Sequence, residues 1–235
     1  MLLDRSLISA LPLFADFAPE ALDEVLSEAR SQRTPKNSHI FEQGADATHF
    51  FLLLHGRVRA YRVTPAGEQI VVRFVGPGEL FGVAPAIGSK VYPANAAAAI
   101  DSVALAWPTS SWPAMSARHP ALAGGMMRTL GDRLQEAQTR IAEMSTQEVE
   151  RRVANALLRL AAQGGTKTED GVAFDFPISR QDIAEMTGTT LFTVSRVFSA
   201  WESMGLIATG RQKIVIRDPH RLAVLADGSA EPGAK

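Results

Sequence analysis

The segment 177–201 constrains the fold more than any other part of the chain, because it holds the start, the turn and the apolar spacing of a two-helix unit. Ser179 and Asp182 form a capping signature, in which the hydroxyl accepts a free backbone N–H and the carboxylate bonds back to the helix start. Gly188 supplies a turn, and Thr190 can cap a second helix. The apolar side chains of that helix recur at intervals of three and four residues, at Val194, Val197, Phe198 and Trp201. The segment therefore predicts a helix-turn-helix.

The opposite face of the second helix has the side chains of a helix that contacts DNA bases. In a helix-turn-helix, the N-terminal half of the second helix enters the major groove. Arg196 can form a bidentate pair with guanine, which is worth about 1–3 kcal/mol of base discrimination, whereas Phe192 can only contact a thymine methyl group or pack against a sugar. Amphipathic helix pairs also occur in helical domains that do not bind DNA, which is the alternative. The DNA contacts expected from the two helices are Ser179, Arg180, Gln181, Thr189, Thr190, Leu191, Phe192, Thr193, Ser195 and Arg196.

A short hairpin is expected after the second helix. Gly205 ends that helix, and apolar residues on both sides of the polar turn 209–213 predict two strands. Arg211 and Lys213 at the tip of this hairpin would lie over phosphates, which gives salt-dependent binding without sequence information. Their alternative role is a solvated hairpin tip. The whole segment predicts a winged helix-turn-helix.

Composition and charge narrow the class of protein. Residues 148–222 contain ten Lys or Arg against nine Asp or Glu, so the predicted DNA-binding part is nearly neutral, and we expect specific binding that weakens as salt rises. The chain has no cysteine, which excludes disulfides, thiolate metal sites and cysteine nucleophiles. The start of the chain lacks the pattern of a secretion signal, and no apolar run approaches about 20 residues, so we expect a cytoplasmic protein.

The first half of the chain alternates short apolar segments with turn residues, which is typical of an antiparallel sandwich or roll. The clearest strands are 39–42, 49–54, 57–63, 69–75 and 102–107. Arg57, Arg59 and Arg62 are expected on exposed strand faces. The expected fold class is therefore α+β, with an N-terminal antiparallel β-roll and a C-terminal helical part.

A long helix is expected between these parts, from about Pro120 to Met144. Its apolar stripe is narrow and flanked by charged residues, which is typical of a helix that pairs with its twin. The alternative is that the stripe packs on its own roll. The predicted dimerisation residues are Leu122, Met126, Leu130, Leu134, Ala137, Ile141 and Met144, and the charged flanks are Arg128, Arg133, Glu136, Arg140 and Glu143.

Two other function classes were weighed. An enzyme is not supported, because the chain has no His-x-x-x-His pair, no phosphate loop and no Gly-x-Ser-x-Gly elbow. A ligand-binding regulatory module that acts on a protein partner, with the C-terminal helices as its contact, remains the alternative to DNA binding.

Four motifs resemble those of the cyclic-AMP receptor protein and fumarate-nitrate regulator (CRP/FNR) family. They are Phe41-Glu-Gln-Gly44, Leu54-His-Gly-Arg57-Val, Gly78-Glu-Leu-Phe-Gly82 and Ser179-Arg-Gln-Asp-Ile-Ala184. The resemblance covers about residues 10–222 and implies a jelly-roll sensing domain at 1–118, a dimerisation helix at 119–147, a winged helix-turn-helix at 148–222 and a flexible tail at 223–235. It also implies a cytoplasmic homodimeric transcription regulator that binds palindromic double-stranded DNA and contacts RNA polymerase. We expect an activator, with repression as the alternative, because the sign depends on where the operator lies. No membrane partner is implied.

The chain departs from the members of this family that bind cyclic nucleotides. Those members hold the ribose with a Glu directly after the second Gly of the motif at 78–82, here called the cassette, and they hold the phosphate with an Arg. In this chain Val83 follows Gly82, and no Arg occurs between Arg73 and Arg118. A buried phosphate would lack a paired cation, since Lys90 has no bidentate fork. Cyclic AMP is therefore not expected as the effector. The expected effector pocket lies between roll and helix, at Phe81, Gly82, Val83, Tyr92, Pro93, Ala94, Met126 and Leu130.

A second departure lies in the recognition helix, where many relatives carry a Glu that accepts from cytosine and this chain has Phe192. The segments Gly188–Arg196 and Tyr92-Pro-Ala are similar to the nitric-oxide-responsive Nnr and Dnr branch, which implies nitric oxide sensed through haem and control of denitrification or nitrogen-oxide genes. The candidate haem ligands are His39, His49, His55 and His119, and for each a surface or hydrogen-bonded role is the alternative. The absence of cysteine argues against an iron–sulfur cluster. No other metal site is predicted.

Overall fold

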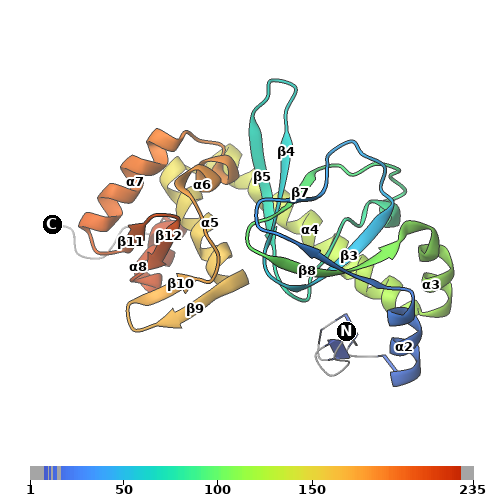
Figure 1. Cartoon of the computed structure of the whole chain (residues 1–235). Helices are drawn as coiled ribbons and strands as arrows, with labels where there is room; N and C mark the ends of the chain where they lie inside the picture. The colour runs from blue at the N-terminus through green and yellow to red at the C-terminus, as the bar shows by residue number, and fades with distance from the viewer. Residues whose placement is uncertain (1–7, 10, 12, 15–16, 229–235) are drawn as a thin grey trace. The chain divides into compact units, whose positions relative to one another are not determined.

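The computed structural model describes residues 8, 9, 11, 13, 14 and 17–228 (Figure 1). It divides into a first unit of residues 1–63 and 73–136 and a second unit of residues 64–72 and 137–235. The long helix α4 spans Pro120–Thr146, which matches the helix expected from about Pro120 to Met144. The predicted α+β class, with an antiparallel roll, a long helix and a C-terminal winged helix-turn-helix, is confirmed. Among the described residues, no helix is both long enough and apolar enough to cross a membrane.

Two four-stranded sheets form the roll. One has the order β1 (Arg30–Thr34), β8 (Ser102–Pro108), β3 (His49–His55) and β6 (Leu80–Phe81), and its neighbouring strands pair antiparallel. The other has the order β2 (His39–Phe41), β7 (Asn95–Ala98), β4 (Val58–Val63) and β5 (Gln69–Val75). All five predicted strands are present. The sequence analysis missed β1, β6 and β7.

Strand β7 shows why some strands were missed. Its sequence is Asn-Ala-Ala-Ala, and neither Asn nor Ala favours a strand by itself. It forms a strand because β2 and β4 pair with it on either side, with His39 opposite Ala97 and Val58 opposite Ala98. The small side chains leave room inside the roll for the aromatic residues of neighbouring strands.

Alternate residues of β3 supply two hydrophobic cores in the first unit, as the two-residue period of a strand requires. Phe50 joins a core that includes Trp107 and the helices α2 (Pro19–Ser27) and α3 (Trp112–Arg118). The indole N–H of Trp107 donates to the carbonyl of Val25 at 2.8 Å. Phe51 joins the second core, which lies inside the roll. Short 3-10 helices at Ala84–Ile87 and Thr109–Ser111 complete this unit.

The second unit combines four helices with a small sheet. The helices are α5 (Val149–Gly164), α6 (Arg180–Thr187), α7 (Leu191–Ser203) and α8 (Pro219–Asp227), and the sheet has the order β11 (Ile207–Gly210), β12 (Lys213–Ile216), β10 (Gly171–Phe174) and β9 (Gly165–Thr168). Gly171 begins β10 with a φ of 129°, and a β-carbon there would lie 2.1 Å from the carbonyl oxygen of Ile216, so this position requires glycine.

Four expectations need correction. The flexible tail was expected from residue 223, but residues 223–227 continue α8, and the remainder at 229–235 lies outside the described residues. Arg57 was expected on an exposed face and is 2% exposed, with its guanidinium beneath Gly76. Glu143 was expected on a charged flank and is 8% exposed, because it pairs with Arg159 of α5. Arg133 was expected on the same flank but lies largely buried and donates to the carbonyl of Leu80.

Candidate nucleic-acid interface

The start of α6 is fixed by the predicted capping box. The hydroxyl of Ser179 accepts the backbone N–H of Asp182 at 3.0 Å, and the carboxylate of Asp182 accepts the backbone N–H of Ser179 at 2.9 Å. Gly188 ends this helix in the left-handed conformation, with a φ of 62°. Thr190 caps α7 by accepting the backbone N–H of Thr193 at 3.1 Å. Local polar side chains therefore set both helix starts of the predicted helix-turn-helix.

The inner face of α7 is buried as its spacing predicts. Val194, Phe198 and Trp201 have no exposed surface, and Val197 is half-buried. The indole N–H of Trp201 donates to the carboxylate of Glu150 on α5 at 2.7 Å. This packing fixes the rotation of α7 about its axis and so decides which side chains point outward.

The outward face of α7 begins with apolar side chains and continues with polar ones. Phe192 is 77% exposed and Leu191 is 47% exposed. Arg196 is exposed one turn later, and Ser195 beside it is half-buried. Neither Ser195 nor Arg196 is enclosed by the unit, so both can contact a base or a phosphate.

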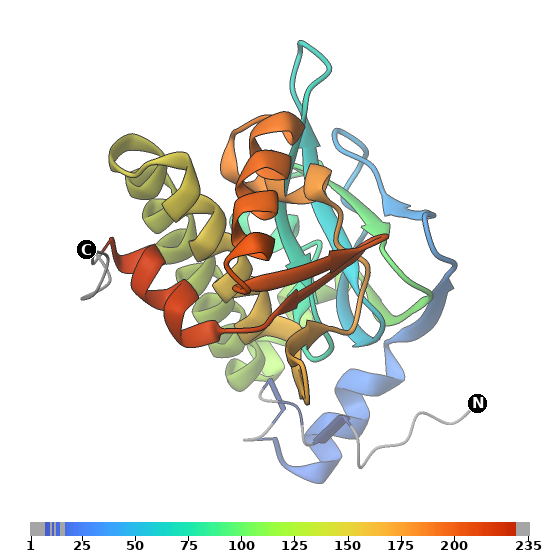
Figure 2. The ribbon, with the colours of Figure 1, turned by 90° about the vertical axis from the view of Figure 1, so that its left-hand side faces the viewer.

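The wing, defined as the β11–β12 hairpin at residues 207–216, lies next to α7 (Figure 2). Its tip residues Arg211, Gln212 and Lys213 are all exposed, and Gln212 has a φ of 56°. The carbonyl of Gln212 accepts the backbone N–H of Ile178 at 3.3 Å, which ties the tip to the segment that precedes α6. Gln212 was predicted only as part of the polar turn, and its exposure beside two cations adds it to the candidate interface.

Three of the predicted contacts on α6 and the turn are held by other protein groups. Arg180 donates to the hydroxyl of Thr209 on the wing at 2.9 Å, and its guanidinium lies 5.8 Å from the ring centroid of Phe198. Gln181 is exposed and donates to the Glu185 side chain at 3.0 Å. Thr189 is half-buried and its backbone N–H donates to the carbonyl of Ala184. The twelve predicted DNA contacts thus fall on α6, the turn, the N-terminal half of α7 and the wing tip.

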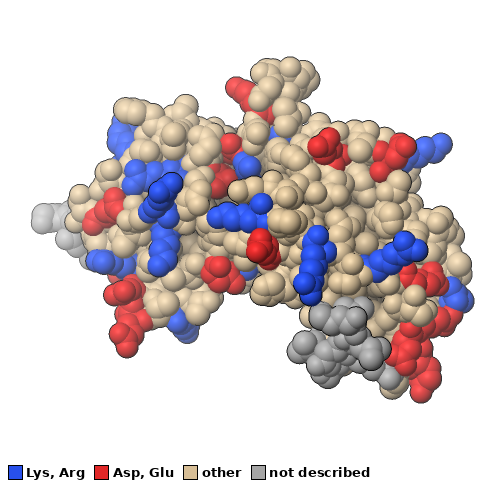
Figure 3. All heavy atoms as spheres, viewed as in Figure 1, with Lys and Arg blue, Asp and Glu red and all other residues tan. Residues whose placement is uncertain are grey.

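Charge on this part of the second unit is mixed but favours cations. Figure 3 shows Lys and Arg atoms gathered at the left end of the view, where α7 and the wing lie, with fewer Asp and Glu atoms among them. Arg196, Arg211, Lys213 and Arg217 are the exposed cations of this region. A polyanion would be attracted to this surface, and the attraction would be screened by salt.

The predicted effector residues fall into two separate clusters of the first unit. Phe81 and Tyr92 belong to the core inside the roll, where the ring of Phe41 stacks on that of Tyr92 with centroids 3.8 Å apart and on that of Phe81 at 6.1 Å. Val83, Met126 and Leu130 belong to the other core. Neither core includes the other three predicted residues: Gly82 separates Phe81 from Val83, and Pro93 and Ala94 follow Tyr92. An aromatic stack therefore occupies the interior of the roll.

Arg133, which was predicted as part of a charged flank of the long helix, instead reaches the cassette 78–82 from α4. Arg133 donates to the carbonyl of Leu80, and Arg73 pairs with Glu79. Burial, reinforced by the nearby charge of Arg73, lowers the pKa of Arg133 to about 10, although Glu79 and Glu136 act in the opposite direction. The cassette thus has a cation beside it that comes from a distant part of the sequence.

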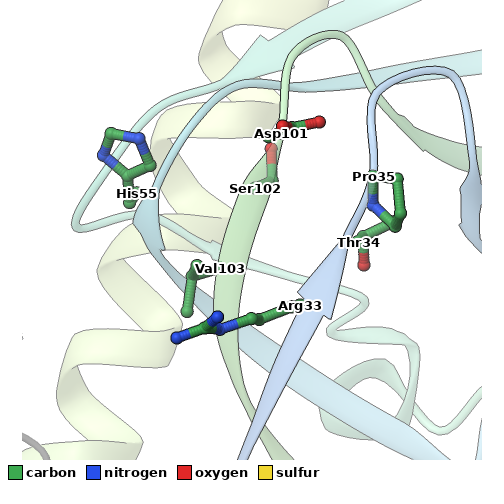
Figure 4. A pocket seen from close by; sticks show the side chains of 7 residues that line it. All are labelled: Arg33, Thr34, Pro35, His55, Asp101, Ser102 and Val103. Carbon is green, nitrogen blue, oxygen red and sulfur yellow. The ribbon is translucent and has the colours of Figure 1, made fainter.

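A pocket with both charged and apolar lining residues, here called the β1–β8 pocket, lies on the roll away from the predicted effector residues (Figure 4). Its volume is about 350 Å³, and Arg33, His55 and Asp101 line it together with Thr34, Pro35, Ser102 and Val103. The carboxylate of Asp101 accepts the backbone N–H of Lys36 at 2.8 Å, and the hydroxyl of Ser102 donates to the carbonyl of Ile100 at 2.8 Å. Both polar groups are thus used by the fold itself.

Family searches agree with this architecture in both units. Residues 31–119 match the cyclic nucleotide-binding domain, and residues 151–225 match the Crp-like helix-turn-helix domain. The chain is 32% identical over 219 residues to the cyclic AMP receptor protein of Thermus thermophilus, with 93% of this chain and 98% of that protein covered. The chain belongs to the CRP/FNR family. It is also 27% identical over 212 residues to the transcriptional activator protein FnrA of Stutzerimonas stutzeri, with 90% of this chain and 86% of that protein covered.

Solved structures of CRP/FNR proteins share the fold. FixK2 from Bradyrhizobium japonicum matches with a TM-score of 0.75 and 25% identity, over 86% of this chain and 99% of that one. A CRP-family transcriptional regulator from Thermus thermophilus matches with a TM-score of 0.72 and 28% identity, over 86% of this chain and all of that one. The chain is thus a DNA-binding transcription regulator with an effector-binding domain. Because its relatives are regulators, the prediction that it is not an enzyme is confirmed.

The four histidines named as haem ligands in this CRP/FNR chain lie apart and mostly hold protein partners. The ring of His39 bonds the Tyr61 hydroxyl at 2.8 Å, that of His49 bonds Thr48 at 3.0 Å, and that of His119 lies 3.3 Å from the carboxylate of Glu24. His55 is exposed and lines the β1–β8 pocket. Within the described residues, no cluster of three His, Asp or Glu side chains is arranged to hold a metal ion. Haem ligation by one of these histidines stays a prediction.

Proposed function

We propose that this CRP/FNR protein acts as a homodimer that inserts α7 of each protomer into successive major grooves of a two-fold symmetric operator. The observation that carries the proposal is the outward face of α7, where Phe192 and Arg196 are exposed beside a wing that ends in two cations. A helix-turn-helix of this kind contacts only a few base pairs, and two copies about 34 Å apart double the contact. The function therefore requires a second protomer.

The surface proposed to join the protomers is an apolar seam on α4. Met127, Leu134 and Ile141 are spaced by seven residues and are 62%, 62% and 65% exposed, and Met144 adds 46% exposure at the end of the helix. Apolar side chains at heptad spacing on one helix pack against the same side chains of a second helix. A second copy of this chain is the partner that matches such a self-complementary seam.

This seam shares Leu134, Ile141 and Met144 with the predicted stripe and differs from it in the N-terminal part of α4. Leu122 and Met126 were predicted dimer residues, but they are 2% and 1% exposed and belong to the core of their own unit. Leu130 is partly buried against the same core, whereas Ala137 is exposed. The N-terminal part of the predicted stripe therefore supports the alternative that it packs on its own roll, and Met127 takes the place of Met126 in the seam.

The signal proposed to control operator affinity is a small effector other than cyclic AMP. Val83 stands where a ribose-binding Glu is expected, and the rings of Phe41, Phe81 and Tyr92 fill the interior of the roll. A charged nucleotide there would lose hydration without gaining a bidentate arginine partner, because the one cation of the segment 83–98 is Lys90. An effector can change operator affinity only by its different affinity for two settings of the dimer, typically 1–3 kcal/mol.

Nitric oxide sensed through haem, with control of denitrification genes, stays a prediction from the resemblance to the Nnr and Dnr branch. The rings of His39, His49 and His119 have contacts within the protein, whereas His55 is exposed and could ligate haem without breaking any of these contacts. The absorption spectrum of the protein after reconstitution with haem tests the idea. A histidine-ligated Soret band that responds to nitric oxide and is lost in one His→Ala variant would support it.

Contact with RNA polymerase is part of the same proposal. A regulator bound beside a promoter changes transcription through such a contact, and the family resemblance favours activation. Reporter transcription with the purified polymerase and an operator placed at successive distances from the promoter measures both the sign and the distance dependence. Repression at every distance would contradict activation.

Operator binding by the full chain is the decisive measurement. We expect selection from a random duplex library to enrich a palindrome, and Arg196→Ala to weaken binding of the dimer to it by about 30- to 25,000-fold, which is the loss of two bidentate guanine pairs, one in each half-site. Arg62→Ala removes an exposed cation from β4 and should leave the affinity unchanged. A regulatory module for a protein partner would instead bind duplexes weakly, with no enriched sequence and no response to Arg196→Ala.

A further inference from the structure

The first turn of α7 exposes an aromatic ring where a DNA-binding helix meets the bases. Among the described residues, Phe192 is the most exposed of the large apolar side chains, at 77%. Leu191 beside it is 47% exposed. Both belong to the N-terminal half of the recognition helix, which is the part that enters the major groove. Their surface would lose contact with water when DNA binds.

The polar side chains of the same turn are turned toward each other. The hydroxyls of Thr190 and Thr193 are 2.9 Å apart, and the Thr190 hydroxyl also accepts the backbone N–H of Thr193. The largest side chains that this turn exposes are the apolar Leu191 and Phe192, and the polar Ser195 and Arg196 follow one turn later. The first turn of α7 and the turn that follows it therefore present different side-chain chemistry to DNA.

Only one group on the major-groove edge of DNA is apolar, the C5 methyl group of thymine. A phenyl ring placed against the amino group of cytosine, or against the acceptors of a purine, would remove water from a polar group without replacing its hydrogen bond. The same ring against a thymine methyl group would bury apolar surface on both partners. Phe192 therefore favours thymine and also disfavours the other bases.

We infer that Phe192 determines operator specificity by contacting the methyl group of a thymine, and that Arg196 contacts a guanine in the same half-site. The side chains of residues four apart on a helix lie about 5–6 Å from each other. Base pairs are stacked about 3.4 Å apart. The thymine and the guanine should consequently lie about one to two base steps apart. This inference rests on the proposed insertion of α7 into the major groove.

Replacement of thymine by deoxyuridine isolates the contact, because it removes the methyl group and leaves every hydrogen bond of the base pair. The duplex is the palindrome selected by the full chain, labelled for fluorescence anisotropy, with each thymine replaced in turn. Burial of one methyl group is worth about 0.8 kcal/mol, which corresponds to about a fourfold change in Kd. We expect the wild-type protein to lose about fourfold in affinity at one thymine of each half-site.

Variants assign the effect to the ring. Phe192→Ala should bind the thymine and deoxyuridine duplexes equally, whereas Arg211→Ala, a matched change at the wing, should bind both more weakly and keep the fourfold ratio. Phe192→Glu should move the preferred base at that position from thymine to cytosine, because a carboxylate accepts from the cytosine amino group. The exposure of Phe192 means that these substitutions leave the core intact, which circular dichroism verifies.

Two results would overturn the inference while leaving the proposed function in place. One is a wild-type protein that is indifferent to deoxyuridine at every thymine of the selected operator. The other is a Phe192→Ala variant that retains the fourfold ratio, which would place the methyl contact on another residue and Phe192 against a sugar. Failure of the full chain to enrich any sequence is a distinct outcome, which overturns the proposed function and with it the role of Phe192.

Discussion

The carboxylate of Glu202 accepts two hydrogen bonds from Thr209, one from its backbone N–H at 2.9 Å and one from its hydroxyl at 2.6 Å. Glu202 lies in the last turns of α7, and Thr209 lies on β11 of the wing. Arg180 at the start of α6 donates to the same Thr209 hydroxyl. The two helices of the helix-turn-helix and the wing are thus joined by a single polar network, so their DNA contacts are positioned together.

Glu202→Ala should loosen the wing. The change leaves the Thr209 backbone N–H without its carboxylate acceptor, and loss of hydrogen bonds to a charged group costs about 1–3 kcal/mol. We expect a drop of that size in the free energy of unfolding in urea, with faster amide exchange at residues 207–216. Glu169→Ala, in the exposed turn between β9 and β10, should change stability by less than about 0.5 kcal/mol. An unchanged wing in Glu202→Ala would show that packing alone positions it.

Removal of both wing-tip cations should reduce the salt dependence of operator binding. If Arg211 and Lys213 each neutralise one phosphate in each protomer, the slope of log K against log salt should fall by about 0.9 for each of these contacts, or about 3.6 for the dimer. The double variant Arg211→Ala, Lys213→Ala should retain the same selected sequence, because phosphate contacts carry no base information. Anisotropy titrations over a range of salt concentrations measure the slope. A changed sequence preference would indicate that the wing contacts bases.

A charge placed in the apolar seam of α4 should separate the protomers. Ile141 is 65% exposed at the centre of the C-terminal half of the seam, and Ile141→Glu would put two like charges opposite each other at the dimer axis. Light scattering on the eluting protein should change from about twice the chain mass of 25.3 kDa to that mass itself. Ala142→Glu adds the same charge one position away on the exposed flank, and it should remain a dimer. Dimeric Ile141→Glu would place the interface elsewhere.

The parts of this fold that the sequence predicted are those set by local contacts. Residues within one or two helical turns of each other form the capping box of Ser179 and Asp182 and the cap at Thr190. The spacing of the buried α7 residues is equally local, so a short segment of sequence contains all three signals. The start of α6, the turn and the wing strands were predicted close to their observed positions for this reason.

The errors concern residues whose surroundings come from distant segments. Arg57, Arg133 and Glu143 are of residue types that usually lie on the surface. Each is instead wholly or largely covered by residues that are distant in the sequence. The exchange of Met126 for Met127 in the seam has the same origin, since the roll covers the face of α4 that includes Met126. The expected effector pocket combined residues of the roll with residues of α4, which only contacts between distant segments could bring together. Five of its residues instead belong to two different hydrophobic cores.

The ion pair between Glu143 and Arg159 joins the end of α4 to α5 within the second unit. Arg159 donates to the Glu143 carboxylate at 2.5 Å, and Arg152 on the same helix donates to the carbonyl of Thr187 at the end of α6. The side chain of Met144, next along α4, lies beside Gly188, where a β-carbon would be 3.2 Å from its Cε. The last turn of α4 is thus in contact with both α5 and the turn of the helix-turn-helix.

Glu143→Gln should destabilise the second unit, because it leaves the cation of Arg159 largely buried without its charged partner. Breaking a fully buried pair costs about 3–5 kcal/mol, and the partial exposure of Arg159 should reduce this to about 2 kcal/mol. Arg159→Met in addition should recover part of the loss, since neither charge is then buried alone. Urea denaturation of both single variants and the double variant gives the coupling energy. Additive effects would show that the pair contributes nothing beyond packing.

The phenol of Tyr92 provides a test of the packed aromatic interior of the roll. Burial raises the pKa of Tyr92 above its usual 10.0, although hydrogen bonds with His49 and Thr48 act in the opposite direction. A raised pKa means that the neutral phenol is favoured in the folded protein. Its contribution to stability is therefore complete below about pH 10 and is lost as the pH rises through the folded value.

The tyrosinate absorbance of a Tyr61→Phe variant reports Tyr92 alone, because the chain has two tyrosines. We expect the titration midpoint of the folded variant to lie above 10, and the same variant in urea to titrate near 10, the value of an exposed phenol. The variant keeps the ring of residue 61 and loses only its hydrogen bond to His39, so the stack of Phe41 on Tyr92 should persist. A folded midpoint at or below 10 would mean that water reaches Tyr92, and with it the interior of the roll, which would make room there for a polar effector.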